Sequence, residues 1–255
     1  MCIIREGDVV LIYFDKRRKY IAKAERDQVL HTDMGIIKLG DLIGKRYGDL
    51  LLTHLNVEYK VIRPTLTQTV YLGFKRGTQV LYPKDIGYMV ITSGVSPGFT
   101  VVEGGVGSGV LTAFLANLVK PTGKVYAYEI NSKYLNIARK NLEKTGLLKY
   151  VEFRERDITK GIIEEDVDAV FLDIPNPWLV VDHARRKLRS GGIFIAFIPT
   201  VNQLEKTVDK LRKEKFTEIE AVELIRRRYK VFPGETRPES LMIGHTGFLV
   251  TAQKL

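Results

Sequence analysis

Hydrophobic residues in the first part of the chain come in short runs, rich in β-branched side chains and separated by glycine and polar residues. Such runs are typical of β-strands, and the pattern predicts strands at residues 8–13, 20–22, 35–39 and 59–62. Turns are expected at Thr32-Asp33 and Gly40-Asp41. Short strands at this spacing predict a small β-barrel or sandwich-like module. Arg63-Pro64-Thr65 ends this module before a helical segment near 66–72.

Beyond this module the pattern changes to a repeat of strand, glycine turn and helix. Strands are predicted at 100–103, 124–129, 151–154, 169–173 and 193–197. Helices are predicted at 111–119, from Asn131 or Ser132 to about Gly146, between the last two strands, and at 202–213. The alternation predicts an α/β fold, a Rossmann-like doubly wound sheet with mainly parallel strands. Two final apolar runs, 218–231 and 246–252, have no helix between them and predict an antiparallel edge hairpin.

The change of pattern divides the 255 residues into two expected domains. A small β-rich domain covers residues 1–75, and an α/β domain covers residues 76–255. No run approaches the roughly 18 apolar residues of a membrane helix. Charged residues at Arg5, Glu6 and Asp8 precede any sustained apolar run, unlike the order of a secretory signal. We therefore expect a cytoplasmic protein with no membrane partner.

The charge balance points to a polyanionic partner. Lys and Arg outnumber Asp and Glu by 40 to 30, a net charge of +10. A surface rich in ion pairs would explain many charges of both signs but not the surplus, which favours nucleic acid. The only cysteine, Cys2, excludes an internal disulfide and could at most cross-link subunits. The four histidines lack the spacing of metal ligands, so no metal is expected.

One motif stands between a predicted strand and a predicted helix: Glu103 followed by Gly105-x-Gly107-x-Gly109. Glycines at such a bend let the backbone approach a ligand without an intervening Cβ. The glycines alone also suit a dinucleotide site, where pyrophosphate lies on the helix N-terminus. A carboxylate at position 103 would repel pyrophosphate. The motif therefore favours a cofactor with a cationic group, such as the ammonium of S-adenosylmethionine.

Two more acids are predicted at the carboxyl ends of strands, where open α/β sheets bind ligands. Glu129 closes the second strand and can accept from two ribose hydroxyls, although it would suit NAD equally well. Asp157 follows the third strand and can accept from an adenine amino group. A helix cap is the structural alternative for Asp157. Together with Glu103, these acids favour S-adenosylmethionine.

A loop stiffened by two prolines, Asp173-Ile-Pro-Asn-Pro-Trp178, follows a buried strand. Asp173 is predicted to accept a hydrogen bond from an exocyclic amine. The candidate substrate pocket includes Pro175, Pro177 and Trp178 as apolar walls for a base. For Trp178 alone, a rigid turn with the ring in the core is the simpler interpretation.

Several stretches carry a resemblance to a known family: 79–85 (Gln-Val-Leu-Tyr-Pro-Lys-Asp), 103–109, Tyr128-Glu129, Asp157, 173–178 and 244–250 (Gly-His-Thr-Gly-Phe-Leu-Val). The chain resembles the tRNA adenine-N1 methyltransferases that modify the T-loop, in their archaeal and bacterial homotetrameric form. The resemblance runs from about residue 63 to the C-terminus, and the small N-terminal module also fits the family. The tyrosine-proline-lysine-aspartate and glycine-histidine-threonine stretches are more specific than the glycine loop.

The resemblance implies a class I S-adenosylmethionine-dependent methyltransferase that forms a homotetramer and methylates N1 of tRNA adenine 58, with adenine 57 allowed as well. Together the motifs and the resemblance assign the cofactor contacts to Leu81, Glu103, Gly105, Gly107, Ser108, Gly109, Val110, Glu129, Asp157, Ile158 and Asp173. Tyr82 resembles the family's aromatic residue in the substrate pocket. Two positions depart from the family: Tyr134 replaces an arginine that touches the cofactor in some members, and Phe197 replaces a tyrosine of the bacterial enzyme.

Asp173 is the expected catalytic residue, accepting from the adenine N6 amine and anchoring the cofactor ammonium. One alternative is a methyltransferase acting on a protein carboxylate or a small molecule, which would need neither the Asp173 loop nor the charge of +10. Another is a non-catalytic RNA-binding subunit, against which the intact glycine loop and Asp173 both count.

Overall fold

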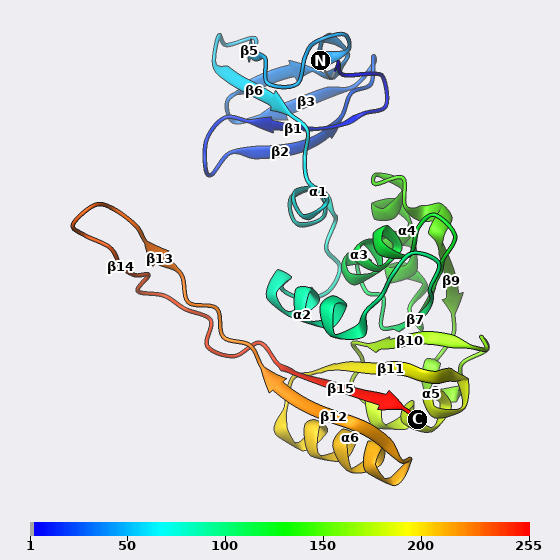
Figure 1. Ribbon diagram of the computed structural model, residues 1–255. Coiled ribbons are helices and arrows are strands. Elements are labelled where there is room, and N and C mark those ends of the chain that lie inside the picture. Colours follow the sequence, from blue (N-terminus) through cyan, green and yellow to red (C-terminus); the bar gives the residue numbers. More distant parts are fainter. Residues whose placement is uncertain (1–2) are drawn as a thin grey trace.

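The computed structural model describes residues 3–255, and Figure 1 shows a small sheet-rich unit at the N-terminus joined to a larger α/β unit. An antiparallel sheet in the order β2-β1-β6-β5 forms the centre of the small unit. Its elements are β1 (Val9–Tyr13), β2 (Lys19–Lys23), β5 (Leu50–Leu52) and β6 (Glu58–Ile62), with a hairpin of β3 (Val29–Thr32) and β4 (Gly35–Lys38) and the short η1 (Leu39–Leu42). The predicted β module is present, and Cys2 lies outside the described residues.

The small unit has a hydrophobic core of its own. It contains Ile4, Val10, Ile12, Ala24, Ile37, Leu39, Leu42, Tyr59 and Val61. Alternate residues of a strand point to opposite faces, so Val10 and Ile12 enter this core together. Leu11 points the other way and is also fully buried, because helix α1 (Leu66–Gly73) packs against β1 and β2.

Helix α1 contacts both units. Thr65, the N-cap residue, and Gln68 form a reciprocal capping box, and the helix begins at Leu66, two residues after Pro64. At its end, Gly73 lies so close to Ile21 of β2 that an added Cβ would be 2.9 Å from that side chain. On its other side, Tyr71 contacts Phe114 and donates a 2.7 Å hydrogen bond to the carbonyl of Leu81. The helix thus connects the small sheet to a segment of the larger unit.

The larger unit is built on a seven-stranded sheet in the order β12-β15-β11-β10-β7-β8-β9. Its parallel strands are β7 (Thr100–Gly104), β8 (Lys124–Glu129), β9 (Val151–Glu155), β10 (Val167–Leu172) and β11 (Leu188–Ile198). Strand β15 (Phe248–Lys254) is antiparallel to both β11 and the edge strand β12 (Phe216–Glu223). The structure confirms the predicted doubly wound, mainly parallel sheet with an antiparallel pair at one edge.

Helices cover both faces of this sheet. One face is covered by α2 (Pro83–Ser93), α3 (Val110–Val119) and α4 (Ser132–Glu143), and the other by α5 (Val181–Lys187) and α6 (Val201–Lys213). Neighbouring residues of β7 enter different cores, Val101 on the first face and Val102 on the second. Strands buried on both faces read as continuous apolar runs, which is the pattern seen in the sequence. Short η2 (Leu148–Tyr150), η3 (Ile158–Lys160) and η4 (Pro177–Leu179) complete the connections.

A long arm, residues 224–247, leaves the sheet between β12 and β15 and projects away from it, ending in the short pair β13 (Tyr229–Lys230) and β14 (Arg237–Pro238) (Figure 1). The sequence pattern predicts a strand as far as residue 231, but the strand ends at Glu223. Three consecutive arginines, 226–228, follow this point and cannot alternate between a buried and a solvated face. Because Phe248 pairs with both Ile198 and Glu223, the arm leaves from the edge where the parallel strands end.

Candidate active site

The carboxyl ends of the parallel strands bring the predicted acids together. Glu103 of β7 is in register with Ala127 of β8 and Phe171 of β10, so the ends of these three strands lie side by side. A cavity of about 700 Å³ opens at this edge. Its predicted lining residues are Gly105, Gly107, Glu129, Asp157, Ile158, Asp173 and Pro175.

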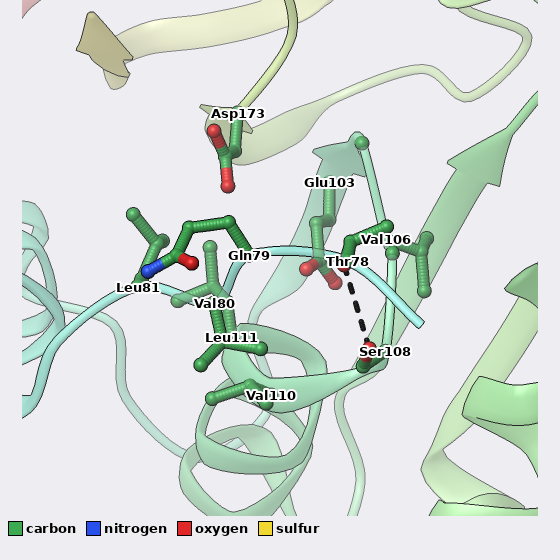
Figure 2. A pocket seen from close by; sticks show the side chains of 12 residues that line it. Thr78, Gln79, Val80, Leu81, Glu103, Val106, Ser108, Val110, Leu111 and Asp173 are labelled. Carbon is green, nitrogen blue, oxygen red and sulfur yellow. Dashed lines mark hydrogen bonds between the residues drawn. The ribbon is translucent and has the colours of Figure 1, made fainter. Parts of the chain in front are cut away.

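A narrow extension of the cavity reaches the start of α3 (Figure 2). It shares Gly105, Gly107 and Asp173 with the main cavity. Its other predicted residues are Leu81, Glu103, Ser108 and Val110. Gly109 is the remaining predicted cofactor contact, and it caps α3 in the left-handed conformation without lining either space.

The loop needs glycine for two reasons: its backbone adopts a left-handed conformation, and another backbone segment approaches it closely. Gly105 has φ +89° and donates its N–H to the carbonyl of Tyr128 at 3.0 Å. A Cβ at this position would be 2.1 Å from the carbonyl oxygen of Asp173. The loop therefore lies directly against the segment that carries Asp173, and only glycine allows this contact.

Replacing Gly105 with alanine is expected to lower the free energy of unfolding by about 2–4 kcal/mol, because a left-handed backbone and a backbone clash are combined. Gly94, the C-cap of α2, is a matched control, since its φ is +62° and a Cβ there would meet nothing within 4 Å. Gly94→Ala should cost only about 1 kcal/mol. Urea unfolding measures both, and equal losses would show that the clash with Asp173 is absent.

An asparagine that carries no motif of its own holds the glycine loop in place. Asn141 of α4 is almost completely buried. Its side chain donates to the carbonyls of Ser108 (3.0 Å) and Lys75 (2.9 Å) and accepts from the Lys75 N–H at 2.9 Å. Ser108 in turn accepts from the Gly77 N–H at 3.0 Å. The segment before α2 is thus fixed against the loop by a side chain that the sequence pattern does not reveal.

Glu103 is a buried carboxylate without a donor. It is 1% exposed, and neither of its oxygens has a hydrogen-bond partner among residues 3–255. Burial raises its pKa to about 8; the nearby Thr112 hydroxyl limits the rise, while the charges of Asp173 and Glu129 add to it. An unpaired buried acid is unfavourable unless a partner satisfies it. The position therefore suits a ligand that brings a cationic donor.

Asp173 lies on the opposite side of the narrow extension, and Figure 2 shows both carboxylates beside the segment 78–81. Its N–H donates to the Gly104 carbonyl at 2.9 Å, which fixes the residue just beyond β10. Burial raises the pKa of Asp173 to about 6. Asp173 can thus contact a group in the extension and a group in the main cavity.

Glu129 and Asp157 are already engaged by the backbone. Glu129 accepts from the N–H groups of Gly107 (3.1 Å) and Asn131 (3.0 Å). Asp157 caps η3 by accepting from the N–H (2.9 Å) and the hydroxyl of Thr159 (2.7 Å), and this hydroxyl is the main cause of its lowered pKa. The helix-cap interpretation of Asp157 is therefore correct. It does not exclude a role in binding, because Asp157 also lines the cavity.

The predicted substrate pocket is only partly assembled. Pro175 lines the main cavity, and Gln203 of α6 donates to its carbonyl at 2.7 Å. Pro177 is buried in η4 and Trp178 lies beside α6, with Lys206 Nζ 5.2 Å from the ring centroid. Neither lines the cavity, so both expectations for Trp178, a wall of the pocket and a place in the core, are wrong. The proline-framed loop turns after Asn176, and its second half packs against α6 instead.

Two motifs distant in sequence meet at the start of α2. Lys84 Nζ lies 2.7 Å from Asp85 Oδ1 and donates to the Thr246 hydroxyl at 2.6 Å. Asp85 is fully buried, and the Thr246 hydroxyl donates to its other oxygen at 3.3 Å. We call this contact, formed by Lys84, Asp85 and Thr246, the α2–arm junction. It holds Tyr82, the N-cap residue of α2, beside the root of the arm, where Tyr82 lines a separate cavity rather than the one that contains Asp173.

The same stretch shapes the wall of the main cavity. His245 Nδ1 lies 2.6 Å from Glu223, and its Nε2 lies 3.0 Å from the Pro199 carbonyl oxygen. The carbonyl first, and Glu223 second, raise the pKa of His245. A Cβ at Gly247 would lie 2.4 Å from the ring of Phe197. Phe197 and Pro199 both line the cavity, so this glycine-histidine-threonine stretch positions its wall.

Other lining residues were not among the predicted site residues: Thr78, Gln79, Tyr128, Ile130, Tyr134, Arg156, Thr159, Ile174, Asn176, Leu179, Phe197, Pro199 and Gln203. Gln79 and Tyr128 belong to stretches that carry the family resemblance, and Arg156 precedes Asp157, so their place in or beside these motifs was the available signal. Phe197 and Gln203 come from β11 and α6, and only the packing of these elements brings them to the site. Within residues 3–255, no group of three or more His, Cys, Asp and Glu side chains is arranged to hold a metal ion, and no helix is long and apolar enough to cross a membrane.

Comparison with known proteins adds a family and its relatives. Residues 60–234 match the family described as tRNA methyltransferase complex GCD14 subunit. The chain is 33% identical over 269 residues to the tRNA (adenine(57)-N(1)/adenine(58)-N(1))-methyltransferase TrmI of Methanocaldococcus jannaschii, a match that covers 95% of this chain and 94% of that protein.

Two crystal structures are similar over nearly the whole chain. The tRNA (m1A58) methyltransferase TrmI from Aquifex aeolicus has a TM-score of 0.82 and 33% identity, covering 100% of this chain and 99% of that one. A SAM-dependent O-methyltransferase from Thermotoga maritima has a TM-score of 0.89 and 37% identity, covering 98% of this chain and 94% of that one.

Proposed function

Because the chain belongs to the family of the tRNA methyltransferase complex GCD14 subunit, we propose that it transfers the methyl group of S-adenosylmethionine to N1 of adenine 58 in the T-loop of tRNA. Its fold is that of the class I S-adenosylmethionine-dependent methyltransferases. One structural observation carries the proposal: the buried carboxyl group of Glu103 and the half-buried carboxyl group of Asp173 line one narrow space. Such a pair suits a cationic cofactor beside an amine-bearing base.

The residues of the cavity fit S-adenosylmethionine. The two oxygens of Glu103 that lack donors match the N–H groups of its ammonium. Glu129, at the end of β8, is placed for the ribose hydroxyls, and Asp157 with Ile158 for the adenine. When bound, the cofactor supplies an electrophilic methyl group on a positively charged sulfur.

The chain's own contribution to the reaction is positioning and electrostatics. The adenine N1 lone pair forms the new bond to carbon while the sulfur–carbon bond breaks, which requires in-line alignment more than acid or base strength. Asp173 accepts from the N6 amine, which raises the electron density at N1 and stabilises the positive charge that develops on the ring. Pro175 and Phe197 offer apolar walls to the base. The proton lost from the product passes to water.

A tRNA substrate also accounts for the charge of the chain. The surplus of +10 suits a phosphate backbone, and an adenine buried in folded tRNA must be extruded before its N1 becomes accessible. The archaeal relative's name includes adenine 57 as well as adenine 58, so both positions belong in the assay.

The direct test is incubation with labelled S-adenosylmethionine and unmodified tRNA, followed by mapping of the labelled nucleoside. Label is expected as 1-methyladenosine at position 58, and a transcript with guanosine at that position should lose this label. Label on protein, or none on RNA, would refute the proposal.

A second candidate is O-methyl transfer to a carboxylate or a small molecule, favoured by the similarity to the SAM-dependent O-methyltransferase from Thermotoga maritima. It would use the same cofactor cavity without needing Asp173 as an acceptor from a base amine. The labelling experiment separates the two candidates, because an O-methylated product is not a nucleobase.

We also propose a cytoplasmic homotetramer in which residues 1–75 contact tRNA or neighbouring subunits. Exposed apolar side chains at the tip of the arm support self-association: Tyr229 is 53%, Val231 72% and Phe232 60% exposed. Light scattering should give the mass of four chains, and a monomer would exclude the assembly. Phe232→Asp should lower that mass.

A further inference from the structure

A second cavity, of about 370 Å³, lies at the root of the arm. Its lining residues are Tyr82, Lys84, Arg226, Arg228, Glu239, Leu241, Met242, Ile243 and Thr246. None of them lines the cavity assigned to the cofactor. The proposed methyl transfer, as described so far, therefore gives this space no role.

The second cavity lies next to the candidate active site, because two consecutive residues line the two spaces. Leu81 lines the narrow extension beside Glu103 and Asp173, and Tyr82 lines the second cavity. The arm itself leaves the sheet at the carboxyl edge of the parallel strands, as Phe248 pairs with the last residue of β11. The α2–arm junction fixes Tyr82 and the arm root to each other through Lys84 and Thr246. An RNA strand that reaches Asp173 from the side of the arm would therefore pass this second cavity.

The charges of the second cavity favour a single phosphate. Lys84 is compensated by the buried Asp85, and Arg228 Nε lies 3.8 Å from Glu239. Arg226 makes no ion pair with any carboxylate of residues 3–255 and supplies the uncompensated positive charge. A guanidinium can bind a phosphate through two parallel N–H groups. One nucleotide carries one such phosphate.

The remaining wall is apolar. Leu241, Met242 and Ile243 are 90%, 50% and 57% exposed, and they line the cavity together with Tyr82. Exposed apolar side chains next to an uncompensated arginine match the two parts of a nucleotide, a flat base or sugar and an anionic phosphate.

We propose that the cavity at the root of the arm binds the nucleotide adjacent to the target adenine, with Arg226 and Arg228 on its phosphate and residues 241–243 against its base or sugar. This proposal rests on the proposed function, because it requires an RNA substrate. It assigns the arm root a role in holding the opened strand, so that the extruded adenine stays beside Asp173.

The test compares three variants of the full chain in tRNA binding and methylation. Arg226→Gln should weaken tRNA binding about fivefold and lower the slope of log K against log salt by about 1, the loss of one phosphate contact. Glu239→Gln should strengthen binding, because it frees Arg228. The control Arg212→Gln removes one charge from the exposed last turn of α6 and should change neither quantity.

A tRNA with a single uncharged methylphosphonate next to the target adenine, placed on either side in turn, locates the contact. On one side of the adenine, the methylphosphonate should weaken tRNA binding by the wild-type protein. The same change should not weaken tRNA binding by Arg226→Gln any further. If Arg226→Gln matches Arg212→Gln while wild type methylates tRNA, the inference fails and the proposed function stands. If Arg226→Gln changes the mass measured by light scattering and leaves the tRNA affinity unchanged, the cavity binds a second copy of the chain instead of a nucleotide. That result would also overturn the inference. Failure of wild type to label RNA would instead refute the proposed function.

Discussion

Asp173→Ala is expected to lower the rate of methyl transfer by about 10²–10³-fold at saturating cofactor and tRNA. The carboxylate is the only predicted catalytic group, and it lines both the narrow extension and the main cavity. Removing it leaves the adenine amine without its acceptor and the developing positive charge without its counter-charge. Single-turnover kinetics with preformed complex measures the chemical step separately from binding. A near-normal rate under these conditions would exclude the assigned role.

Asp173→Asn distinguishes the charge of the side chain from its position. The amide oxygen still accepts a hydrogen bond, but the negative charge is gone, so we expect a rate between those of Asp173→Ala and wild type. The pH profile gives a second readout. Burial raises the pKa of Asp173 to about 6, so the wild-type carboxyl is protonated below that pH and ionised above it. The rate of the free enzyme with dilute tRNA should therefore rise with pH through about 6, and this rise should be absent in Asp173→Asn.

Glu103→Gln is expected to stabilise the ligand-free protein while weakening cofactor binding about 10–100-fold. The folded-state pKa of Glu103 is about 8, against a usual value of 4.5. The folded protein therefore holds a proton that the unfolded chain releases, so the free energy of unfolding falls as the pH rises from about 4.5 to about 8. At pH 7 this penalty is about 3 kcal/mol, and the glutamine variant removes it.

Urea unfolding between pH 5 and pH 8 measures this effect. The wild-type protein should lose stability with rising pH more steeply than Glu103→Gln. Glu205→Gln, on the exposed side of α6, removes the same charge from a solvated position and should keep the wild-type slope. Calorimetry with S-adenosylmethionine checks the affinity. A variant that is both less stable and unchanged in affinity would contradict the assignment of Glu103 to the cofactor ammonium.

The sheet and most of its helices can be predicted from the sequence because the central strands β7, β8 and β10 are mainly apolar runs that end at glycine or an acid. The acids at the strand ends follow for the same reason, since parallel strands present their carboxyl ends at one edge. Helix α2 cannot be predicted from the sequence pattern, although Pro83 lies in its first turn, because its apolar positions resemble those of neighbouring loops. The first residues of the arm, Leu224 and Ile225, are apolar and extend the predicted strand, but β12 ends at Glu223 because three consecutive arginines follow.

The errors at the site have a common cause in tertiary packing. Trp178 follows a stiff loop, which predicts a place at the cavity or in the core, but α6 lies beside it and Lys206 covers its ring. Asn141 carries no local signal, yet it fixes the glycine loop through contacts between segments far apart in sequence. Phe197 reaches the cavity because Gly247, fifty residues later, leaves room for its ring.

Helix α1 has a consequence for any attempt to divide the chain. The change of sequence pattern suggests a cut near residue 75, which would remove α1 with the small sheet. That cut would also remove Tyr71, whose hydroxyl donates to the carbonyl of Leu81 in the wall of the narrow extension, and would uncover Phe114 of α3. A truncated α/β unit would thus lose a support of its cofactor cavity, while a unit that kept α1 would expose the surface that β2 covers. The boundary seen in the pattern of residues is not a place where the folded molecule can be separated without cost to both parts.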